Sequence, residues 1–491
     1  MSGRTSEKTK KRAAGNGEPP KKSGGPTARK GKPATGNEGP AAKRTHAPDR
    51  MPPAEQRETV SLPQPPSAAR RIVVVGGGAS GMAAAIAAAR EANGVAQVIL
   101  LEKQARVGRK LLATGNGRCN LGHTPLTADH YVSGDRAALE AFLQCRARSD
   151  PAALWHALGL LCREEEGRIY PYSNQASGVL DILRDAMQQD GVLQYCGVAV
   201  RSVRKQADGF LLQLTQTQPE DTAPTVTLYA DRLILACGGA DAPALGGGMD
   251  GFALAGSLGH GCTALLPGLT GVIGTWQDEA GDPVREMGGL LRGVRAHAAA
   301  TLFDAAKSDG PCLASDTGEL QFNEDGISGI PVLQLSLRLQ SARRPVIALD
   351  LLPQLAEKEL EALLLQRLDR CPDAETLFLG TIHKRLVQAL CRCTGIALHD
   401  TLTPDGAQRL ARAAKDLQLA VTGTAGWAGA QTTVGGVPLA EAAPETCASL
   451  RCPGLYLTGE LLDAAGECGG FNLDWAFSTG LRAGRAAARS F

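Results

Sequence analysis

The chain has 491 residues, of which 43% are apolar, 21% charged and 4% aromatic, and its formal net charge is +2. This length suggests two or more domains, and the composition is that of an ordinary globular protein able to bury a large core. No stretch approaches the roughly 18 uninterrupted apolar residues of a membrane span, so none is expected. The thirteen cysteines are scattered without a CxxC pair, which favours reduced thiols and a cytoplasmic location.

Positive charge is concentrated at the N-terminus. Residues 1–58 carry 14 Lys/Arg and 6 Asp/Glu, a net charge of +8, which leaves −6 for the rest of the chain. A segment this rich in Lys, Gly and Pro cannot bury enough apolar surface to offset the entropy of ordering, so residues 1–68 are predicted to be a disordered basic tail. Two interpretations stay open: a tether to nucleic acid, or a solubilising extension. The tail lacks the apolar core of a signal peptide.

The stretch from Arg71 to Glu102 is typical of a dinucleotide-binding unit. An apolar run enters a GxGxxG motif, an alanine-rich segment follows, and a second apolar run ends on Glu102. Gly76 allows the tight turn, Gly78 lets the backbone approach a pyrophosphate, and Gly81 lets the helix pack close to the strand. The helix N-terminus then offers free N–H groups to phosphates. Glu102 is placed to accept hydrogen bonds from an adenosine ribose, which favours FAD or NAD over NADP.

The next segment, GRKLLATGNGRCN, adds glycines and basic residues that suit a pyrophosphate or an anionic reduced flavin; an ordinary surface loop is the alternative. A second GxGxxG match, at Gly246, Gly248 and Gly251, has no apolar strand before it. We therefore interpret it as a loop that caps the following helix. No separate Rossmann domain for NAD(P)H is expected.

The pattern of apolar and polar residues changes twice in the middle of the chain. Residues 198–217 and 226–229 alternate in polarity like the strands of a meander, and the apolar strand at 231–239 is expected to return the chain to the nucleotide-binding sheet. After residue 266, short β-like pieces such as 290–298 precede helices rich in Leu, Glu and Arg, which indicates an inserted domain. The predicted domains are the tail (1–68), a first part of an FAD-binding domain (69–265), the insert (266–419) and the C-terminal part of the FAD-binding domain (420–491).

The C-terminal stretch from Cys452 to Ala488 is the second strong signal. A short apolar strand is followed by Gly459 and Glu460, a turn that can bring an acid to the ribityl and pyrophosphate region of a flavin. Gly470 then opens a long helix whose N-terminus can approach the flavin pyrimidine ring and stabilise negative charge on it. Glycine caps between core elements would explain the glycines but not the acid. Two separated segments suited to one dinucleotide favour FAD over NAD.

The sequence thus predicts one FAD site assembled from both ends of the chain. The residues predicted to contact the cofactor are Gly76, Gly78, Ala79, Ser80, Gly81, Glu102, Lys103, Gly108, Arg109, Lys110, Leu111, Gly115, Gly117, Arg118, Asn120, Gly459, Glu460, Gly470, Phe471 and Asn472.

A flavin enzyme also needs a group that holds or transfers a proton while hydride moves at the flavin N5 atom. The candidates, in segments expected to border the ring, are Arg118, Cys119, Tyr170, Glu467 and Cys468. Cys119 and Cys468 could form a redox pair, although two small buried thiols are the favoured interpretation. The eight histidines show no HxH or HExxH spacing, so no metal site is expected.

An ordered set of motifs resembles one family, the BaiN-type, aminoacetone-oxidase-like FAD-binding flavoproteins. The resemblance covers the chain from about residue 70 to the C-terminus. It implies an α/β fold with a Rossmann-like FAD-binding domain, two-part in sequence, and an inserted domain of β-rich and helical structure. The chain departs from the family pattern at Cys237, at Phe471 and after Phe322. The matching motifs are GGGASGMAAA, GRKLLATGNGRCN, LILACGG, GGMDGFALAGSLGH, GELQFNEDGISGIPVLQLS, AQTTVGGVPL and GLYLTGELLDAAGECGGFNLDWAFSTG.

The resemblance also implies a flavin-dependent oxidoreductase. Family names imply amine oxidation in some members and reduction of steroid or bile-acid C=C bonds in others. The expected function is therefore hydride transfer between FAD and a small or steroid-like organic substrate, by C=C reduction or by amine or C–H oxidation, with NADH or NADPH as candidate electron donors. One alternative is a flavin-bearing redox sensor or binding protein tethered to nucleic acid by its basic tail; a weaker one is an NAD-dependent dehydrogenase. Nucleic acid is expected to bind only through the tail.

Overall fold

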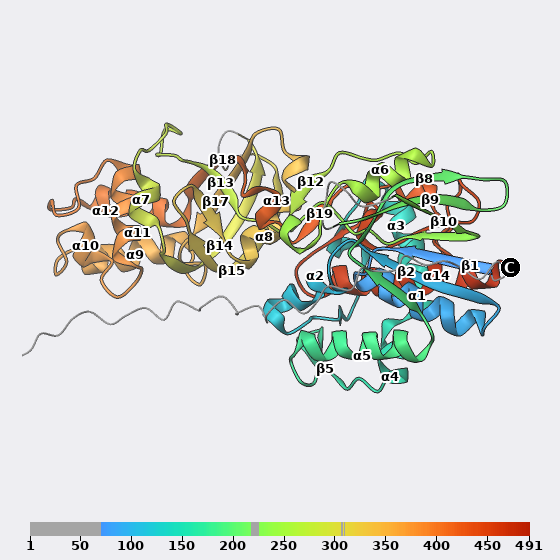
Figure 1. Cartoon of the computed structure of the whole chain (residues 1–491). Coiled ribbons are helices and arrows are strands. Elements are labelled where there is room, and N and C mark those ends of the chain that lie inside the picture. Colours follow the sequence, from blue (N-terminus) through green and yellow to red (C-terminus); the bar gives the residue numbers. More distant parts are fainter. Residues whose placement is uncertain (1–69, 218–224, 306–307, 309) are drawn as a thin grey trace, which may run out of the picture. The chain divides into compact units, whose positions relative to one another are not determined.

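The computed structural model of the chain describes residues 70–217, 225–305, 308 and 310–491 (Figure 1). The predicted basic tail, residues 1–68, lies outside these described residues. Within them, no helix is both long enough and apolar enough to cross a membrane.

A five-stranded parallel sheet carries the nucleotide-binding fold. Its strand order is β20-β11-β1-β2-β7, and each neighbouring pair is parallel. Residues 72–75 are all buried, as expected for a central strand covered on both faces. Strand β20 comes from the C-terminal segment and pairs with β11, so the two separated segments build one sheet. The strands are β1 (Arg70–Val75), β2 (Ala96–Glu102), β7 (Leu193–Cys196), β11 (Arg232–Leu235) and β20 (Leu455–Leu457).

Helices α1 (Ala79–Ala92) and α14 (Phe471–Arg489) pack side by side against this sheet (Figure 1). Their backbones approach closely because small residues face each other. A Cβ added to Gly480 would lie 2.3 Å from the carbonyl oxygen of Ser80, and one added to Gly484 would lie 2.2 Å from that of Ala84. This close packing holds α14 against the helix that follows the GxGxxG turn.

The predicted meander is confirmed. Strands β8 (Val198–Lys205), β9 (Phe210–Gln216) and β10 (Val226–Ala230) form a three-stranded antiparallel sheet that contacts β1 and β2. Helix α5 (Ala176–Gln189) packs on α1.

Two small antiparallel sheets connect the loops around α14. Strand β6 (Arg168–Pro171) lies between β3 (Gly122–His123) and β5 (Cys162–Glu165). Strand β4 (Tyr131–Val132) pairs with β21 (Ala465–Gly466). These pairings bring residues from the first third of the chain to the start of the C-terminal helix.

The inserted region contains a closed barrel with strand order β13-β16-β15-β14-β17-β18. Strand β18 runs across the predicted boundary at residue 419, and the division into domains stays a prediction. The prediction of β structure for 290–298 is wrong at its start, because Leu290 lies in helix α7 (Met287–Leu291). The next residue, Leu291, packs into the core of the insert from that helix. The barrel strands are β13 (Val272–Trp276), β14 (Arg295–Asp304), β15 (Cys312–Phe322), β16 (Gly326–Ser328), β17 (Pro345–Asp350) and β18 (Leu417–Thr424).

Further elements connect these sheets, among them the short helices η2 (Ala128–His130), η5 (Leu339–Ser341), η6 (Leu439–Glu441) and η7 (Gly459–Leu461). The others are α2 (Arg109–Ala113), α3 (Arg136–Gln144), α4 (Pro151–Ala157), α6 (Asp250–Ser257), α8 (Ile330–Ser336), α9 (Glu357–Arg367), α10 (Ala374–Leu377), α11 (Lys384–Thr394), α12 (Pro404–Lys415), α13 (Gly426–Gly429), the short helices η1 (Thr114–Gly117), η3 (Cys145–Ser149) and η4 (Pro243–Leu245), and the paired strands β12 (Leu266–Gly268) and β19 (Thr432–Val434).

Candidate functional site

A pocket lies at the carboxyl ends of β1, β2 and β11. Its walls are the GxGxxG turn, the end of β2, the segment around α2, the loop after β11 and the turn after β20. Ligands of open parallel sheets bind at this edge, because strand ends and helix N-termini converge there. Twelve of the residues predicted to contact a cofactor line the pocket: Gly76, Gly78, Ala79, Ser80, Glu102, Lys103, Gly108, Arg109, Lys110, Leu111, Glu460 and Asn472.

The three glycines of the motif have different surroundings. Gly76 has a φ of +109°, and a Cβ there would lie 2.2 Å from the carbonyl oxygen of Ala236, so both conformation and space require glycine. At Gly81 a Cβ would lie 1.8 Å from the carbonyl oxygen of Gly76. At Gly78 a Cβ would meet no atom of the described residues within 4 Å, because this glycine faces the pocket.

The Glu102 carboxylate is held in place by backbone donors. It accepts hydrogen bonds from the N–H groups of Gly77 at 2.6 Å and Gln104 at 2.7 Å. A carboxylate has further lone pairs, so the group can still accept from a ribose hydroxyl. The structure therefore places the predicted ribose acid at the end of β2 with a defined orientation.

The second GxGxxG match belongs to this same pocket. Gly246, Gly247 and Gly248 line it, together with Gly239 after β11, and the turn η4 rather than a strand precedes them. The sequence predicts a loop here and not a second fingerprint, but it does not predict that this loop forms a wall of the pocket. Its only signal in the sequence was the run of glycines itself.

The other eight residues predicted to contact a cofactor do not line this pocket. Gly81 and Gly459 are packing positions, since a Cβ on Gly459 would lie 2.7 Å from Ser80 Oγ. The remaining six lie in the η1 loop or at the start of α14: Gly115, Gly117, Arg118, Asn120, Gly470 and Phe471.

The start of α14 combines free donors with an orphaned acceptor. Gly470 is the N-cap with a φ of +103°, and within the described structure no side chain caps the helix. Its first N–H groups therefore lack intrahelical partners. A Cβ on Gly470 would lie 2.5 Å from Asn120 Oδ1, an oxygen that is buried without a hydrogen-bond partner among the described residues. Donors beside a buried acceptor fit the pyrimidine edge of a flavin, which presents both acceptors and a donor.

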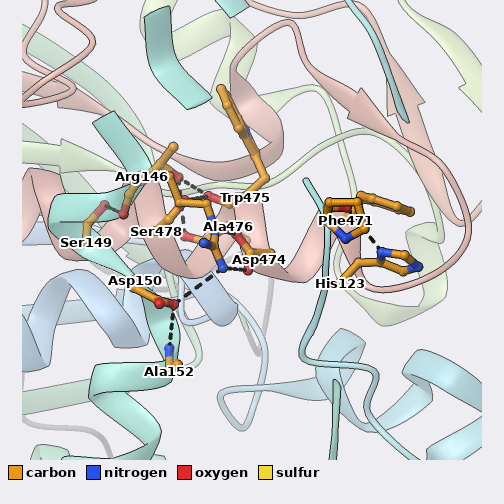
Figure 2. Close-up of polar contacts among 12 residues, drawn as sticks. His123, Arg146, Ser149, Asp150, Ala152, Phe471, Asp474, Trp475, Ala476 and Ser478 are labelled. Carbon is orange, nitrogen blue, oxygen red and sulfur yellow. Dashed lines mark hydrogen bonds and ion pairs between the residues drawn. The ribbon is translucent and has the colours of Figure 1, made fainter. Parts of the chain in front are cut away.

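A buried ion pair anchors this helix start. Asp474, in the first turn of α14, accepts hydrogen bonds from Arg146 Nε at 2.6 Å and Nη2 at 2.7 Å (Figure 2). Burial raises the pKa of Asp474, and the bond to Arg146 opposes that rise. Arg146 also contacts Asp150 at 3.4 Å, and Asp150 caps α4 by accepting the N–H of Ala152 (Figure 2). One guanidinium thus ties η3 and α4 to α14.

Three of the predicted catalytic candidates form a cluster beside η1. The Arg118 guanidinium lies 4.1 Å from the ring centroid of Tyr170 and 2.7 Å from Glu165. Tyr170 is buried beneath it. Cys119 is fully buried with a φ of +60°, and burial raises its pKa to about 12, so it is a neutral thiol near pH 7.

The other two candidates lie in the loop before α14. The Cys468 N–H donates to Gln334 of α8 at 2.8 Å, and burial raises the pKa of its thiol to about 12. Glu467 Oε2 is hydrogen-bonded to His130 Nδ1 at 3.1 Å, and its other oxygen lies 3.8 Å from Arg338. Since both Cys119 and Cys468 are neutral, neither supplies the thiolate that a redox pair uses.

His130 is a residue that sequence reasoning missed. Its ring stacks on Phe471 with centroids 4.5 Å apart, and His123 stacks on the same ring at 4.5 Å. No local spacing connects His130 with Glu467; the pairing of β4 with β21 does. The described residues contain no group of three or more His, Cys, Asp or Glu that could hold a metal ion.

Comparison with known proteins places this site in a family. Residues 70–486 match the model of the HI0933-like protein Rossmann domain. The chain is 37% identical over 410 residues to a 3-dehydro-bile acid delta(4,6)-reductase of Clostridium scindens, covering 82% of this chain and 95% of that protein. It is 27% identical over 389 residues to a ribosomal RNA dihydrouridine synthase of Escherichia coli, covering 78% of this chain and 90% of that protein. A solved flavocytochrome c3 fumarate reductase in an open conformation covers 86% of this chain and 79% of its own, at 15% identity and a TM-score of 0.43.

The parallel sheet, the glycine turn and the family match together define a flavoprotein oxidoreductase with a Rossmann-type FAD-binding domain. More particularly, the chain belongs to the HI0933-like family, whose domain model it matches over most of its length.

Proposed function

We propose that this protein uses FAD to reduce a C=C bond conjugated to a carbonyl group in a small, steroid-like organic molecule. The orphaned Asn120 oxygen beside the free N–H groups of α14 is the observation that carries the flavin position. The substrate class draws support from the names of two relatives: a delta(4,6)-reductase saturates C=C bonds of a 3-oxo steroid acid, and a dihydrouridine synthase saturates the C=C bond of a uracil ring. In both, the double bond is conjugated to a carbonyl.

In this proposal the chain holds the cofactor at three places. The turn from Gly76 to Gly78 and the N-terminus of α1 bind the pyrophosphate, and Glu102 binds the adenosine ribose. Asn120 and the first N–H groups of α14 bind the pyrimidine edge. Bound FAD supplies hydride at its N5 atom, and NADH or NADPH is the proposed source of electrons. The free N–H groups and the helix dipole of α14 stabilise negative charge at that edge.

We assign proton transfer to the pair of His130 and Glu467. Both side chains are partly exposed, at 33% and 25%, next to the start of α14. Histidine is the residue that most often carries out such transfers in enzymes. The other candidates are less suited: Arg118 is committed to Glu165, and the buried thiol of Cys468, with a pKa of about 12, is too weak an acid.

A second candidate substrate, uracil in RNA, is favoured by the dihydrouridine synthase relatives and by the +8 charge of residues 1–58. Against it stands the −6 charge of residues 59–491, since RNA-binding surfaces concentrate positive charge. We therefore place the small carbonyl-conjugated alkene first.

The test is a reoxidation experiment under anaerobic conditions. The full-length protein is reduced with NADH or NADPH and mixed with a 3-oxo-Δ4,6 steroid or with an unmodified ribosomal RNA transcript, and the flavin band at ~450 nm is followed. Rapid return of the band with the steroid, and a product heavier by two hydrogens, is the expected result. If the flavin band returns only with RNA, and no longer does so once residues 1–58 are removed, the second candidate is selected. If the band returns with neither substrate, both candidates are overturned.

Replacement of His130 by Phe should keep the ring stack on Phe471 but remove the imidazole group that transfers the proton. The rate of substrate reduction is expected to fall about 100-fold, the usual contribution of acid catalysis, while reduction of the flavin by the nicotinamide donor stays unchanged. Stopped-flow measurement separates the two half-reactions. Glu467→Gln should act alike, whereas Glu140→Gln removes an exposed carboxylate elsewhere and serves as the control. A comparable loss in Cys468→Ala alone would move the assignment to Cys468.

A further inference from the structure

Lys110, Asp241 and Glu460 form an ionic cluster at the wall of the cofactor pocket. Lys110 Nζ lies 2.6 Å from Asp241 Oδ2 and 2.6 Å from Glu460 Oε2. The three side chains come from α2, the loop after β11 and the turn after β20. Lys110 and Glu460 line the pocket, while the side chain of Asp241 is 0% exposed behind them.

Neither carboxyl group can turn away from this cluster. Glu460 Oε1 accepts the N–H of Thr433 at 2.6 Å, and Thr433 Oγ1 lies 3.2 Å from Asp241 Oδ1. A Cβ on Gly239 would lie 2.4 Å from Glu460 Oε1, so glycine there makes room for the carboxyl group. The positions of the two acids are therefore set by the surrounding backbone.

Two carboxylates against one ammonium leave an excess negative charge where the side chain of Asp241 is 0% exposed and that of Glu460 is 18% exposed. Such an arrangement retains one proton on the pair of acids. Among the described residues, the titratable groups that face Glu460 are Asp241 and Lys110. Burial and then the charge of Asp241 raise the pKa of Glu460 to about 8, whereas Lys110, against the effect of burial, holds the pKa of Asp241 below its usual value. The directions of the two shifts place the retained proton on the Glu460 side of the pair.

We infer that Asp241 is a positioning residue of the cofactor site, which holds Lys110 at the pocket wall and keeps a proton on Glu460. The pocket wall then carries a cation and a neutral acid, whose proton is shared with Asp241, in place of a second negative charge beside the phosphates and ribityl chain of FAD. This inference rests on the FAD site proposed above. Asp241 was not among the residues predicted from the sequence, because nothing local distinguishes it within its glycine-rich loop.

Binding of FAD should therefore be linked to this proton. The anionic dinucleotide opposes ionisation of Glu460, so the bound protein keeps the proton to higher pH than the free protein does. Affinity is expected to stay constant below the pKa of Glu460 near 8 and to weaken above it. The limiting slope for one proton is about tenfold in Kd per pH unit.

The experiment measures FAD release from the full-length holoprotein on dilution, by flavin fluorescence, from about pH 6 to about pH 9.5. For the natural protein, Kd should rise about tenfold across the upper part of this range. The side chain in Glu460→Gln cannot ionise. In Asp241→Asn, Glu460 faces Lys110 without a second carboxyl group and is already ionised at neutral pH. Both variants should therefore show a Kd that does not change with pH. Glu140→Gln is the control, because Glu140 is an exposed carboxylate outside the pocket lining that pairs with Arg136 at 2.9 Å. Its profile should follow that of the natural protein.

A merely structural role would lower affinity by one factor at every pH and leave the slope unchanged. A flat profile in the natural protein, or a slope that persists in both Glu460→Gln and Asp241→Asn, would overturn the inference. Failure to retain FAD at any pH would overturn the cofactor site as well. Normal, proton-linked FAD binding without reduction of any alkene would overturn only the proposed reaction.

Discussion

Replacement of Gly78 by Val is expected to abolish flavin binding while the fold stays intact. Gly78 has φ −80° and ψ −169°, an extended conformation that valine also adopts. A Cβ there meets nothing within 4 Å among the described residues, so the added side chain enters the pocket rather than the core. It would occupy the path by which the pyrophosphate approaches the backbone. Affinity for FAD should fall at least about 100-fold, which corresponds to ~3 kcal/mol.

Gly81→Ala is the matched comparison within the same motif. Its Cβ would lie 1.8 Å from the carbonyl oxygen of Gly76 and 3.3 Å from Ala236 Cβ, so α1 must move away from the sheet. Overpacking of this kind costs up to about 3 kcal/mol, and we expect a lower melting temperature together with loss of flavin. Thermal denaturation and the absorbance at ~450 nm distinguish the two variants. Normal flavin content in Gly78→Val would refute the site, and unfolding of that variant would refute the separation of roles.

Replacement of Arg146 by Ala is expected to destabilise the whole nucleotide-binding domain. Asp474 is 3% exposed, and without the guanidinium its carboxylate would stay buried with its main partner removed. Loss of one member of a buried ion pair costs about 3–5 kcal/mol. Because Asp474 lies in the first turn of α14, flavin should also be lost from the protein that remains folded. Chemical denaturation followed by circular dichroism gives the change in free energy of unfolding.

The control for this variant is an arginine whose ion pairs are exposed. Arg136 contacts Asp129 and Glu140, and its side chain is 60% exposed, so Arg136→Ala should change stability by less than about 1 kcal/mol. The double variant Arg146→Ala/Asp474→Ala should recover part of the loss, because it removes the unpaired acid. Equal changes in the free energy of unfolding for Arg146→Ala and Arg136→Ala would show that the buried pair stabilises the fold no more than the exposed pairs do.

Several features of the fold were predictable because their signals are local. The order of apolar run, glycine turn, alanine-rich segment and second apolar run predicts β1, α1 and β2, and the alternation at 198–217 predicts β8 and β9. Local signals failed where they fit two kinds of structure. Leu290 and Leu291 suit the end of a helix as well as a strand, and they form a helix here because they pack against the core of the insert. The closure of the barrel depends on pairing between distant strands, which periodicity does not specify.

The candidate site also has features with a local sequence signal and features that depend on tertiary packing. By itself, the sequence predicted one FAD-type pocket to which residues from distant segments of the chain contribute, because glycine spacing and strand-end acids act within a few residues. Tertiary structure alone decided which side chains meet: Lys110 with Glu460 across 350 positions, His130 with Glu467 across 337, and Arg146 with Asp474 across 328. Such partners carry no mark in the sequence, because their proximity is produced by the packing of α14 and β20 against the sheet. Asp241 illustrates the difference, since burial behind Lys110 gives an ordinary loop residue its place in the site.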